Sequence, residues 1–324
     1  MIVESEFKPA PWLRNPHLQT LFAASLRPRP RLEVRRERIE LPDGDFLDLD
    51  WTDTGAAPGA PLVLLLHGLT GSIESKYARG LMRCVQAQGW RAVLMHFRGA
   101  SGEPNRLPRG YHSGETTDVD YIARLLHARE PQTPLAAVGY SLGGNVLLKW
   151  LGEQGSNLPL RTAVAISVPF DLWLCAEAIR QGFSRVYMNR LLRLMRAGVR
   201  QKFQRIEAPF PLPPLHRLRD FFEYDEAITA PLHGFAGADD YYRRCSSRPF
   251  LRHIRIPTLI LHARDDPFMS PQVVPHAHEL SEQVRLELSE HGGHVGFVGA
   301  DARGRPVFWL EQRIPAHLAH YLTA

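Results

Sequence analysis

The feature that most constrains this chain is the pentapeptide Gly139-Tyr140-Ser141-Leu142-Gly143. It directly follows an apolar run at 135–138 and precedes a segment of helical periodicity at 145–150. A strand, a turn and a helix in that order are the context of a G-x-S-x-G turn, which exposes a serine hydroxyl at the edge of a sheet. Glycines are needed there because the strand and the helix approach too closely for side chains. The pattern therefore predicts that Ser141 is an exposed nucleophile.

Strands and helices alternate on both sides of this turn, which is typical of a parallel sheet with helical crossovers. The segments expected to form strands are 32–41, 46–51, 62–66, 91–95, 135–138, 163–166, 258–261 and 284–288. The segments expected to form helices are 75–88, 116–129, 273–280 and 308–321, the last interrupted or bent at Pro315. We therefore expect an α/β fold with a mostly parallel central sheet and helices on both faces.

The alternation stops at about residue 171 and resumes at Pro257. Between these points the chain reads as helices and proline-rich loops, which predicts a helical cap inserted over the active edge of the sheet. The expected organisation is an N-terminal arm at 1–31, a core made of 32–171 and 254–324, and a cap at 172–253.

The composition narrows the class of protein. The 324 residues include 44% hydrophobic and 23% charged residues, as in an ordinary globular enzyme. The net charge of +5 comes from dispersed arginines, and no nucleic-acid-binding motif is present, so we expect no nucleic-acid partner. Three cysteines give no disulfide framework, the first residues do not resemble a signal peptide, and no apolar run could span a bilayer. These features predict a cytoplasmic protein.

A serine hydroxyl is a weak nucleophile at neutral pH, so it needs a general base within reach and a carboxylate that orients this base. In sites of this kind, the acid and the base follow the serine in chain order. The predicted strand 258–261 leads into Asp265 and Asp266. Asp266, just before Pro267, has the offset expected for the acid, whereas Asp265 is the alternative and would more simply stabilise the turn.

The loop after strand 284–288 contains His291 and His294, separated by two glycines. The glycines form a flexible turn that can present an imidazole. We expect His294 to be the base because the small and apolar segment after it can pack down, and His291 is the alternative. The pair lacks the spacing and the additional ligands of a zinc site. No metal and no cofactor are expected.

Acyl transfer also requires hydrogen-bond donors for the oxyanion. The backbone N–H of Leu142, directly after the serine, is the first candidate, and the N–H of Leu69, in the loop after strand 62–66, is the second. Three other polar residues, Arg98, His17 and His112, are expected to have structural roles, Arg98 by holding loops through their carbonyl groups.

One segment of the predicted cap combines basic and apolar residues at helical spacing. The basic residues are Arg190, Arg193, Arg196, Arg200, Lys202 and Arg205. We expect the helix to pack by its apolar face and to expose its basic face to solvent. The alternative is that the basic face attracts anionic membrane surfaces or acyl substrates.

The chain resembles the YheT-like branch of the α/β-hydrolases, which is related to eukaryotic abhydrolase-domain lipases and esterases. The segments that carry the resemblance are 12–20, 67–72, 97–99, 102–105, 111–116, 139–145, 232–235, 241–242, 263–268 and 292–297. They extend over nearly the whole chain. For Asn15-Pro16-His17 in the first segment, packing is the only role that we predict.

The resemblance implies an α/β-hydrolase fold with a serine nucleophile at Ser141, an acid at Asp266 and a base at His294. It also implies hydrolysis of carboxylic esters, of short- or medium-chain acyl esters or acylglycerols, so the expected partner is a small acyl ester. A thioesterase or acyltransferase with the same triad is one alternative. A catalytically silent fold that serves as a binding protein is another, which the intact set of three residues argues against.

Overall fold

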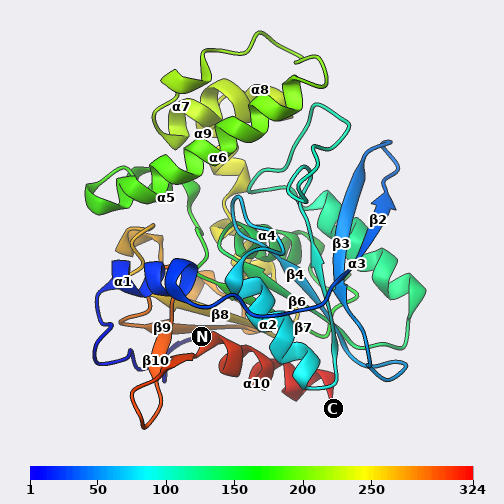
Figure 1. Ribbon diagram of the computed structural model, residues 1–324, viewed down its shortest axis with the longest axis vertical. Helices are drawn as coiled ribbons and strands as arrows, with labels where there is room; N and C mark the ends of the chain where they lie inside the picture. The colour runs from blue at the N-terminus through cyan, green and yellow to red at the C-terminus, as the bar shows by residue number, and fades with distance from the viewer. Residues whose placement is uncertain (324) are drawn as a thin grey trace.

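Nine strands form one sheet in the computed structural model, which describes residues 1–323 (Figure 1). Their order is β1-β9-β8-β7-β6-β4-β5-β3-β2. In this order, the first seven strands, from β1 at the edge to β5, are parallel to their neighbours. Strand β3 is antiparallel to both β5 and β2. The strands are β1 (Ile2–Glu4), β2 (Arg35–Glu40), β3 (Phe46–Thr52), β4 (Leu62–Leu66), β5 (Arg91–Met95), β6 (Leu135–Tyr140), β7 (Thr162–Ile166), β8 (Thr258–Ala263) and β9 (Val284–Ser289). This arrangement confirms the predicted fold class.

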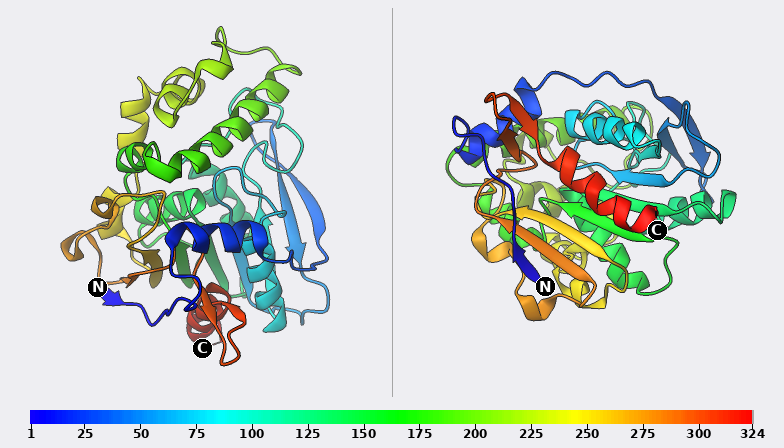
Figure 2. Two further views of the ribbon diagram at one scale, coloured as in Figure 1. Left: turned by 60° about the vertical axis from the view of Figure 1, so that its left-hand side comes forward. Right: turned by 90° about the horizontal axis from the view of Figure 1, so that it is seen from below.

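Helices cover both faces of the sheet (Figure 2). Successive side chains of a strand point to opposite faces, so Leu64 and Leu65 of β4 enter two different core clusters. Leu64 shares its cluster with α3 and α4, and Leu65 shares its cluster with α2 and α10. These helices are α2 (Lys76–Ala87), α3 (Thr117–Arg129), α4 (Leu142–Gln154) and α10 (Leu310–Leu322).

The prediction of a helix at 273–280 is wrong. Residues 273–280 form no α-helix but two short 3₁₀ turns, Pro271–Val273 and Ala277–Glu279. Pro275 explains this, because the residue before a proline avoids the helical conformation, and Val274 is extended with ψ of 122°. By contrast, the predicted final helix is present as α10, which is not interrupted at the buried Pro315.

The segment between β7 and β8 contains only helices and loops within the described residues, and it lies above the carboxyl ends of the parallel strands (Figure 1). We call Leu172–His253 the cap. Its helices are α5 (Leu172–Ala178), α6 (Arg185–Phe203), α7 (Phe221–Tyr224), α8 (Ala230–His233) and α9 (Ala238–Cys245), with shorter 3₁₀ and π turns at Gly182–Ser184, Leu215–Arg217, Asp225–Thr229 and Arg248–His253. No helix within residues 1–323 is both long and apolar enough to cross a membrane.

The N-terminal residues contribute a short strand that hydrophobic periodicity did not indicate. The short strand β1 extends the sheet by pairing parallel with β9 at its edge. It is followed by α1 (Pro16–Leu21) and a π turn, Phe22–Leu26. At the other end of the chain, the hairpin of β10 (Val298–Ala300) and β11 (Pro306–Phe308) lies between β9 and α10 in sequence.

Arg98 holds the loops beside β5 together, but through carboxylates and not through the carbonyl groups that we expected. Its buried guanidinium donates to both oxygens of Asp118, at 2.7 and 2.8 Å, and to Asp43 and Asp45 at 2.7 and 2.9 Å. Three carboxylates around one guanidinium explain the raised pKa of Arg98, which stays charged despite its burial.

We expect Arg98→Met to lower the free energy of unfolding by about 3 kcal/mol, because removal of one partner leaves buried carboxylates without a counter-charge. Urea unfolding at neutral pH measures this loss. Arg193→Met, on the exposed face of α6, is the control and should change stability by less than about 0.5 kcal/mol. Equal stability of the two variants would contradict the structural role of Arg98.

Candidate active site

Ser141 lies between β6 and α4 in a strained backbone conformation, with φ of 52° and ψ of −118°. The turn is tight enough to exclude side chains on both sides. A Cβ atom at Gly139 would lie 2.4 Å from the carbonyl oxygen of Gly143, and one at Gly143 would lie 2.5 Å from that of His67. A non-glycine residue with positive φ is costly and is retained mainly at functional sites. The two flanking glycines therefore allow the turn that presents the Ser141 hydroxyl.

His294 lies between Ser141 and Asp266. Its Nε2 atom is 3.0 Å from Ser141 Oγ, and its Nδ1 atom is 2.8 Å from Asp266 Oδ2. An ionised carboxylate only accepts hydrogen bonds, so Nδ1 carries the proton and Nε2 is free to accept from the serine hydroxyl. The Asp266 side chain is only 1% exposed, which excludes competing water from this bond.

Phe268 supports both members of this pair, and hydrophobic periodicity alone gave no indication of its role. Its ring stacks on the His294 imidazole, with centroids 3.9 Å apart and planes 7° from parallel. Its backbone N–H donates to Asp266 Oδ1 at 2.9 Å. One residue thus fixes the plane of the imidazole and the rotamer of the carboxylate.

The alternative pair, Asp265 and His291, lies farther out. His291 Nδ1 is 3.2 Å from Asp265 Oδ2, and the His291 side chain is exposed. Asp265 Oδ1 accepts the backbone N–H of Gly293 at 2.9 Å and so supports the loop that carries His294. Among residues 1–323, no group of three or more His, Cys, Asp or Glu side chains is placed to hold a metal ion.

The loop after β4 lies directly beside Ser141. Leu66 pairs with Gly139 in the parallel register, and a Cβ atom added to Gly68 would lie 3.3 Å from Ser141 Cβ. The His67 imidazole holds the base of this loop, because Nδ1 is 2.7 Å from the Gly68 carbonyl oxygen and Nε2 accepts the N–H of Phe97 at 3.2 Å. Complete burial lowers the pKa of His67 to about 3, so the ring is neutral and structural.

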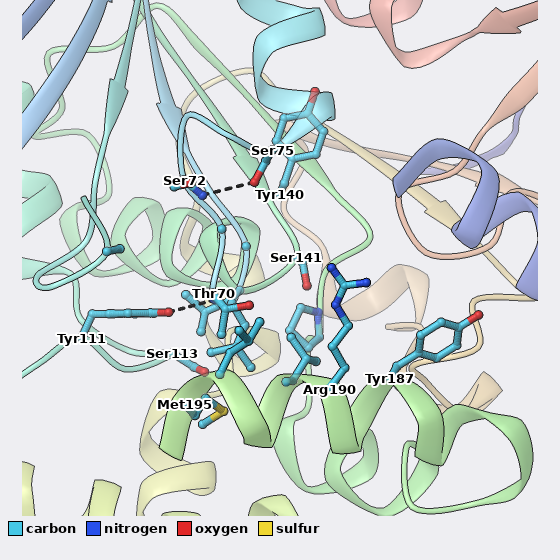
Figure 3. A pocket seen from close by; sticks show the side chains of 18 of the residues that line it. Thr70, Ser72, Ser75, Tyr111, Ser113, Tyr140, Ser141, Tyr187, Arg190 and Met195 are labelled. Carbon is cyan, nitrogen blue, oxygen red and sulfur yellow. Dashed lines mark hydrogen bonds between the residues drawn. The ribbon is translucent and has the colours of Figure 1, made fainter. Parts of the chain in front are cut away.

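Two tyrosines fix the same loop further along. The Gly68 N–H donates to the Tyr77 hydroxyl at 2.9 Å. The Thr70 N–H donates to the Tyr111 hydroxyl, also at 2.9 Å (Figure 3). The N–H of Leu69, between them, has no acceptor within residues 1–323. It is therefore available to an atom bound beside Ser141.

Leu142 is the first residue of α4. The N–H groups of the first helical turn have no acceptor within the helix, and the helix dipole is positive at this end. The Leu142 N–H thus adds a second donor next to Ser141, at a position that favours negative charge.

A cavity of about 810 Å³ lies between the sheet edge and the cap, and Ser141 lines it (Figure 3). Apolar side chains from the cap form a large part of its wall: Leu172, Ile179, Leu191, Leu194, Met195, Val199, Phe203 and Phe221. Leu192 does not take part, since it is buried in the core of the cap. The cavity is large enough for an acyl chain of several carbons.

The basic residues of α6 do not all belong to one solvated face. Lys202 is buried, and its Nζ donates to the carbonyl oxygens of Leu107, Pro108 and Arg109 at 2.7–3.1 Å. Burial lowers the pKa of Lys202 to about 8. Arg190 extends from α6 toward Ser141 and lines the cavity (Figure 3). The prediction of an exposed basic face is therefore wrong for Lys202, whereas Arg190 is exposed although it also lines the cavity.

Comparison of the chain with known proteins identifies its family. The family model described as the alpha/beta hydrolase fold matches residues 61–301. The chain belongs to the α/β hydrolase fold family. This α/β hydrolase is 47% identical over 323 residues to the YheT protein of Escherichia coli (strain K12), which is described as a candidate esterase, with 99% of this chain and 95% of that protein covered.

Two further relatives of this α/β hydrolase are more distant. Phospholipase ABHD3 of Mus musculus is 30% identical over 305 residues, which cover 92% of this chain and 74% of that protein. The solved esterase Pf2001 of Pyrococcus furiosus has a TM-score of 0.57 and 15% identity, with 99% of both chains covered. At that identity the likeness to Pf2001 shows the fold alone.

A buried carboxylate, that of Asp225, also lines the cavity. Asp225 is buried and accepts hydrogen bonds from Thr229 Oγ1 at 2.6 Å and from the Tyr242 hydroxyl at 2.8 Å. Burial raises the pKa of Asp225 to about 7, and the nearby Asp220 acts in the same direction. Because the folded pKa lies above the unfolded value, the protonated carboxyl is compatible with the fold and its ionisation opposes folding.

We expect Asp225→Asn to abolish part of the pH dependence of stability. Below about pH 4 the Asp225 carboxyl is protonated in both the folded and the unfolded state, so its ionisation does not affect stability. As the pH rises, ionisation of Asp225 destabilises the folded state increasingly, until the pH exceeds about 7. The melting temperature of the variant should therefore exceed that of the unmodified protein at pH 8 and approach it at pH 5. A constant difference at both pH values would contradict this assignment.

Proposed function

We propose that this esterase-type hydrolase cleaves carboxylic esters of short- to medium-chain acids through an acyl-enzyme on Ser141. The observation that carries the proposal is the continuous hydrogen-bond chain from Ser141 through His294 to the buried Asp266. Such a chain activates a hydroxyl only where a general base and an orienting carboxylate are aligned.

In the first step, Ser141 Oγ attacks the ester carbonyl carbon while His294 Nε2 takes the hydroxyl proton. Asp266 stabilises the imidazolium, and the N–H groups of Leu142 and Leu69 donate to the oxyanion. The tetrahedral intermediate collapses, the bond to the alcohol oxygen breaks, and the imidazolium gives its proton to that oxygen. The alcohol leaves and Ser141 keeps the acyl group.

In the second step, water attacks the acyl-enzyme. His294 Nε2 takes a proton from the water, and the same two N–H groups receive the new oxyanion. When this intermediate collapses, Ser141 leaves the carbonyl carbon and recovers its proton from the imidazolium. The carboxylic acid departs and the enzyme returns to its starting state without an added cofactor.

The apolar wall of the cavity supports an acyl chain as the group that the cap recognises. The names of the relatives, a candidate esterase and a phospholipase, are in keeping with an acyl ester substrate. A cytoplasmic location is in keeping with the three cysteines, which are all free within residues 1–323. Contact of the exposed Arg193 and Arg200 with anionic membranes stays a prediction.

We expect Ser141→Ala to eliminate covalent labelling by a fluorophosphonate probe and to lower kcat by a factor of about 10⁴ or more, because the nucleophile is lost. Circular dichroism should show an unchanged fold. Ser113→Ala, which removes another serine hydroxyl from the cavity wall, is the matched control and should retain labelling. Labelling of the Ser141→Ala protein at another residue would refute the assignment.

The cavity predicts a dependence on acyl-chain length. With p-nitrophenyl esters, kcat/KM should rise about fourfold per methylene, equivalent to about 0.8 kcal/mol, until the cavity is full, and then fall. Met195→Trp, inside the cavity, should move the optimum to shorter chains, whereas Arg193→Trp on the exposed face should leave it unchanged. A flat profile would contradict acyl recognition by the cap.

A further inference from the structure

The segment Asn15–Thr20 has no part in the mechanism described above, yet it packs against the loop that carries His294. We call residues 290–297 the histidine loop. The Asn15 side chain caps α1 by accepting the N–H groups of His17 and Leu18 at 3.0 and 3.1 Å. In Figure 1, α1 lies below α5 and α6 of the cap and close to β9 and β10.

We propose that α1 is a positioning element for the general base, in which Thr20 and Gln19 hold the backbone that presents His294. This inference rests on the proposed function of His294. Its first support is a direct contact: the backbone N–H of His294 donates to Thr20 Oγ1 at 2.9 Å. The Thr20 hydroxyl itself donates to the carbonyl oxygen of Pro16 at 2.8 Å, so its orientation is fixed.

Gln19 holds the far end of the histidine loop. Its fully buried side chain accepts the N–H of Val298 at 2.7 Å and donates to the carbonyl oxygens of Val298 and Leu13 at 3.0 and 2.7 Å. Three hydrogen bonds from one buried amide leave it a single orientation. Thr20 and Gln19 thus attach the chain to α1 at His294 and at Val298, on either side of Gly296.

The contact between α1 and the histidine loop has no room for side chains. A Cβ atom at Gly293 would lie 2.5 Å from the Pro16 carbonyl oxygen and 2.7 Å from Thr20 Oγ1. A Cβ atom at Gly296 would lie 2.9 Å from the backbone oxygen of Gln19. The two glycines allow the backbones to touch, which transmits the position of α1 to the loop.

The histidine loop needs support of this kind because its own backbone is strained. Val295 and Phe297 have φ values of 56° and 44°, which branched and bulky residues avoid. Such conformations persist only where surrounding contacts impose them. The Ser167 hydroxyl accepts the N–H of Val295 at 3.0 Å from the sheet side, and α1 supplies the contacts on the other side.

The same helix also reaches the cap. His17 Nδ1 is 3.3 Å from the Tyr187 hydroxyl of α6, and their rings are stacked with centroids 5.9 Å apart. The Tyr187 ring lies 4.9 Å from that of Phe268, which stacks on His294. The arm therefore contacts the backbone of His294 directly through Thr20. It contacts the His294 imidazole indirectly, from His17 through the rings of Tyr187 and Phe268.

Removal of the Thr20 acceptor should impair turnover more than substrate binding. A displacement of about 1 Å of a catalytic group costs up to about 100-fold in rate. Thr20 also lines the cavity, but valine has nearly the same shape as threonine, so the substitution keeps the shape of the wall. We expect Thr20→Val to lower kcat for p-nitrophenyl butyrate by about tenfold or more with KM within about twofold. Thr20→Ser, which keeps the hydroxyl, should restore most of kcat.

Thr162→Val is the matched control for the loss of a buried hydroxyl. Thr162 Oγ1 donates to the Pro257 carbonyl oxygen at 2.8 Å, at the start of β7 and thus at the edge of the sheet opposite Ser141. This variant should lose stability but keep kcat. Equal losses of kcat in Thr20→Val and Thr162→Val, or no gain from Thr20→Ser, would overturn the positioning role.

A second pair of variants tests α1 at Asn15, which does not contact His294. Because Asn15 is exposed, its substitution disturbs no buried packing. Asn15→Ala removes an exposed cap and should lower kcat, whereas Asn15→Asp keeps the cap and should not. Fluorophosphonate labelling of the unmodified protein separates failure of the proposed function from failure of the positioning role of α1. If the unmodified protein is labelled and turns over, unchanged kcat in both Asn15→Ala and Thr20→Val refutes the role of α1 alone. If it is not labelled at all, the proposed function fails.

Discussion

The close approach of backbone at the turn of Ser141 is the constraint on which the other features of the site depend. Because Gly139 and Gly143 have no side chains, β6, α4 and the end of β4 can meet within contact distance. That contact imposes the positive φ of Ser141 and places its hydroxyl at the carboxyl edge of the sheet. The N–H groups of Leu69 and Leu142, which we propose as oxyanion donors, are close to it for the same reason.

Three separate parts of the chain hold the His294 imidazole in position. The loop after β8 supplies the carboxylate of Asp266 and the stacked ring of Phe268. The sheet supplies the hydroxyl of Ser167, and the N-terminal arm supplies Thr20. A base that is held on all sides loses little entropy when it reacts, which is the physical advantage of a rigid site. The cap contributes apolar side chains to the wall of the cavity beside it, so the proposed acyl recognition and the proposed chemistry use different segments of the chain.

Much of the fold could be predicted from the sequence because buried parallel strands are short apolar runs between turns, as at Leu62–Leu66. The segment 273–280 does not form the expected helix because Pro275 outweighs its apolar pattern. The strand β1 is only three residues long, so no periodicity could reveal it. Tyr77, Tyr111, Phe268 and Thr20 were not predicted, since each acts through a contact with residues distant in the chain. The catalytic roles of Ser141, Asp266 and His294 stay predictions.

If Ser141 carries the acyl group during turnover, mass spectrometry of the enzyme quenched during hydrolysis of p-nitrophenyl butyrate should detect it there. We expect one butyryl group on the peptide that contains Ser141, and a burst of p-nitrophenol equal to the enzyme concentration wherever deacylation is slower than acylation. Use of the His294→Ala protein should eliminate both the burst and the adduct. Steady hydrolysis with the butyryl group on a different residue would refute the role of Ser141.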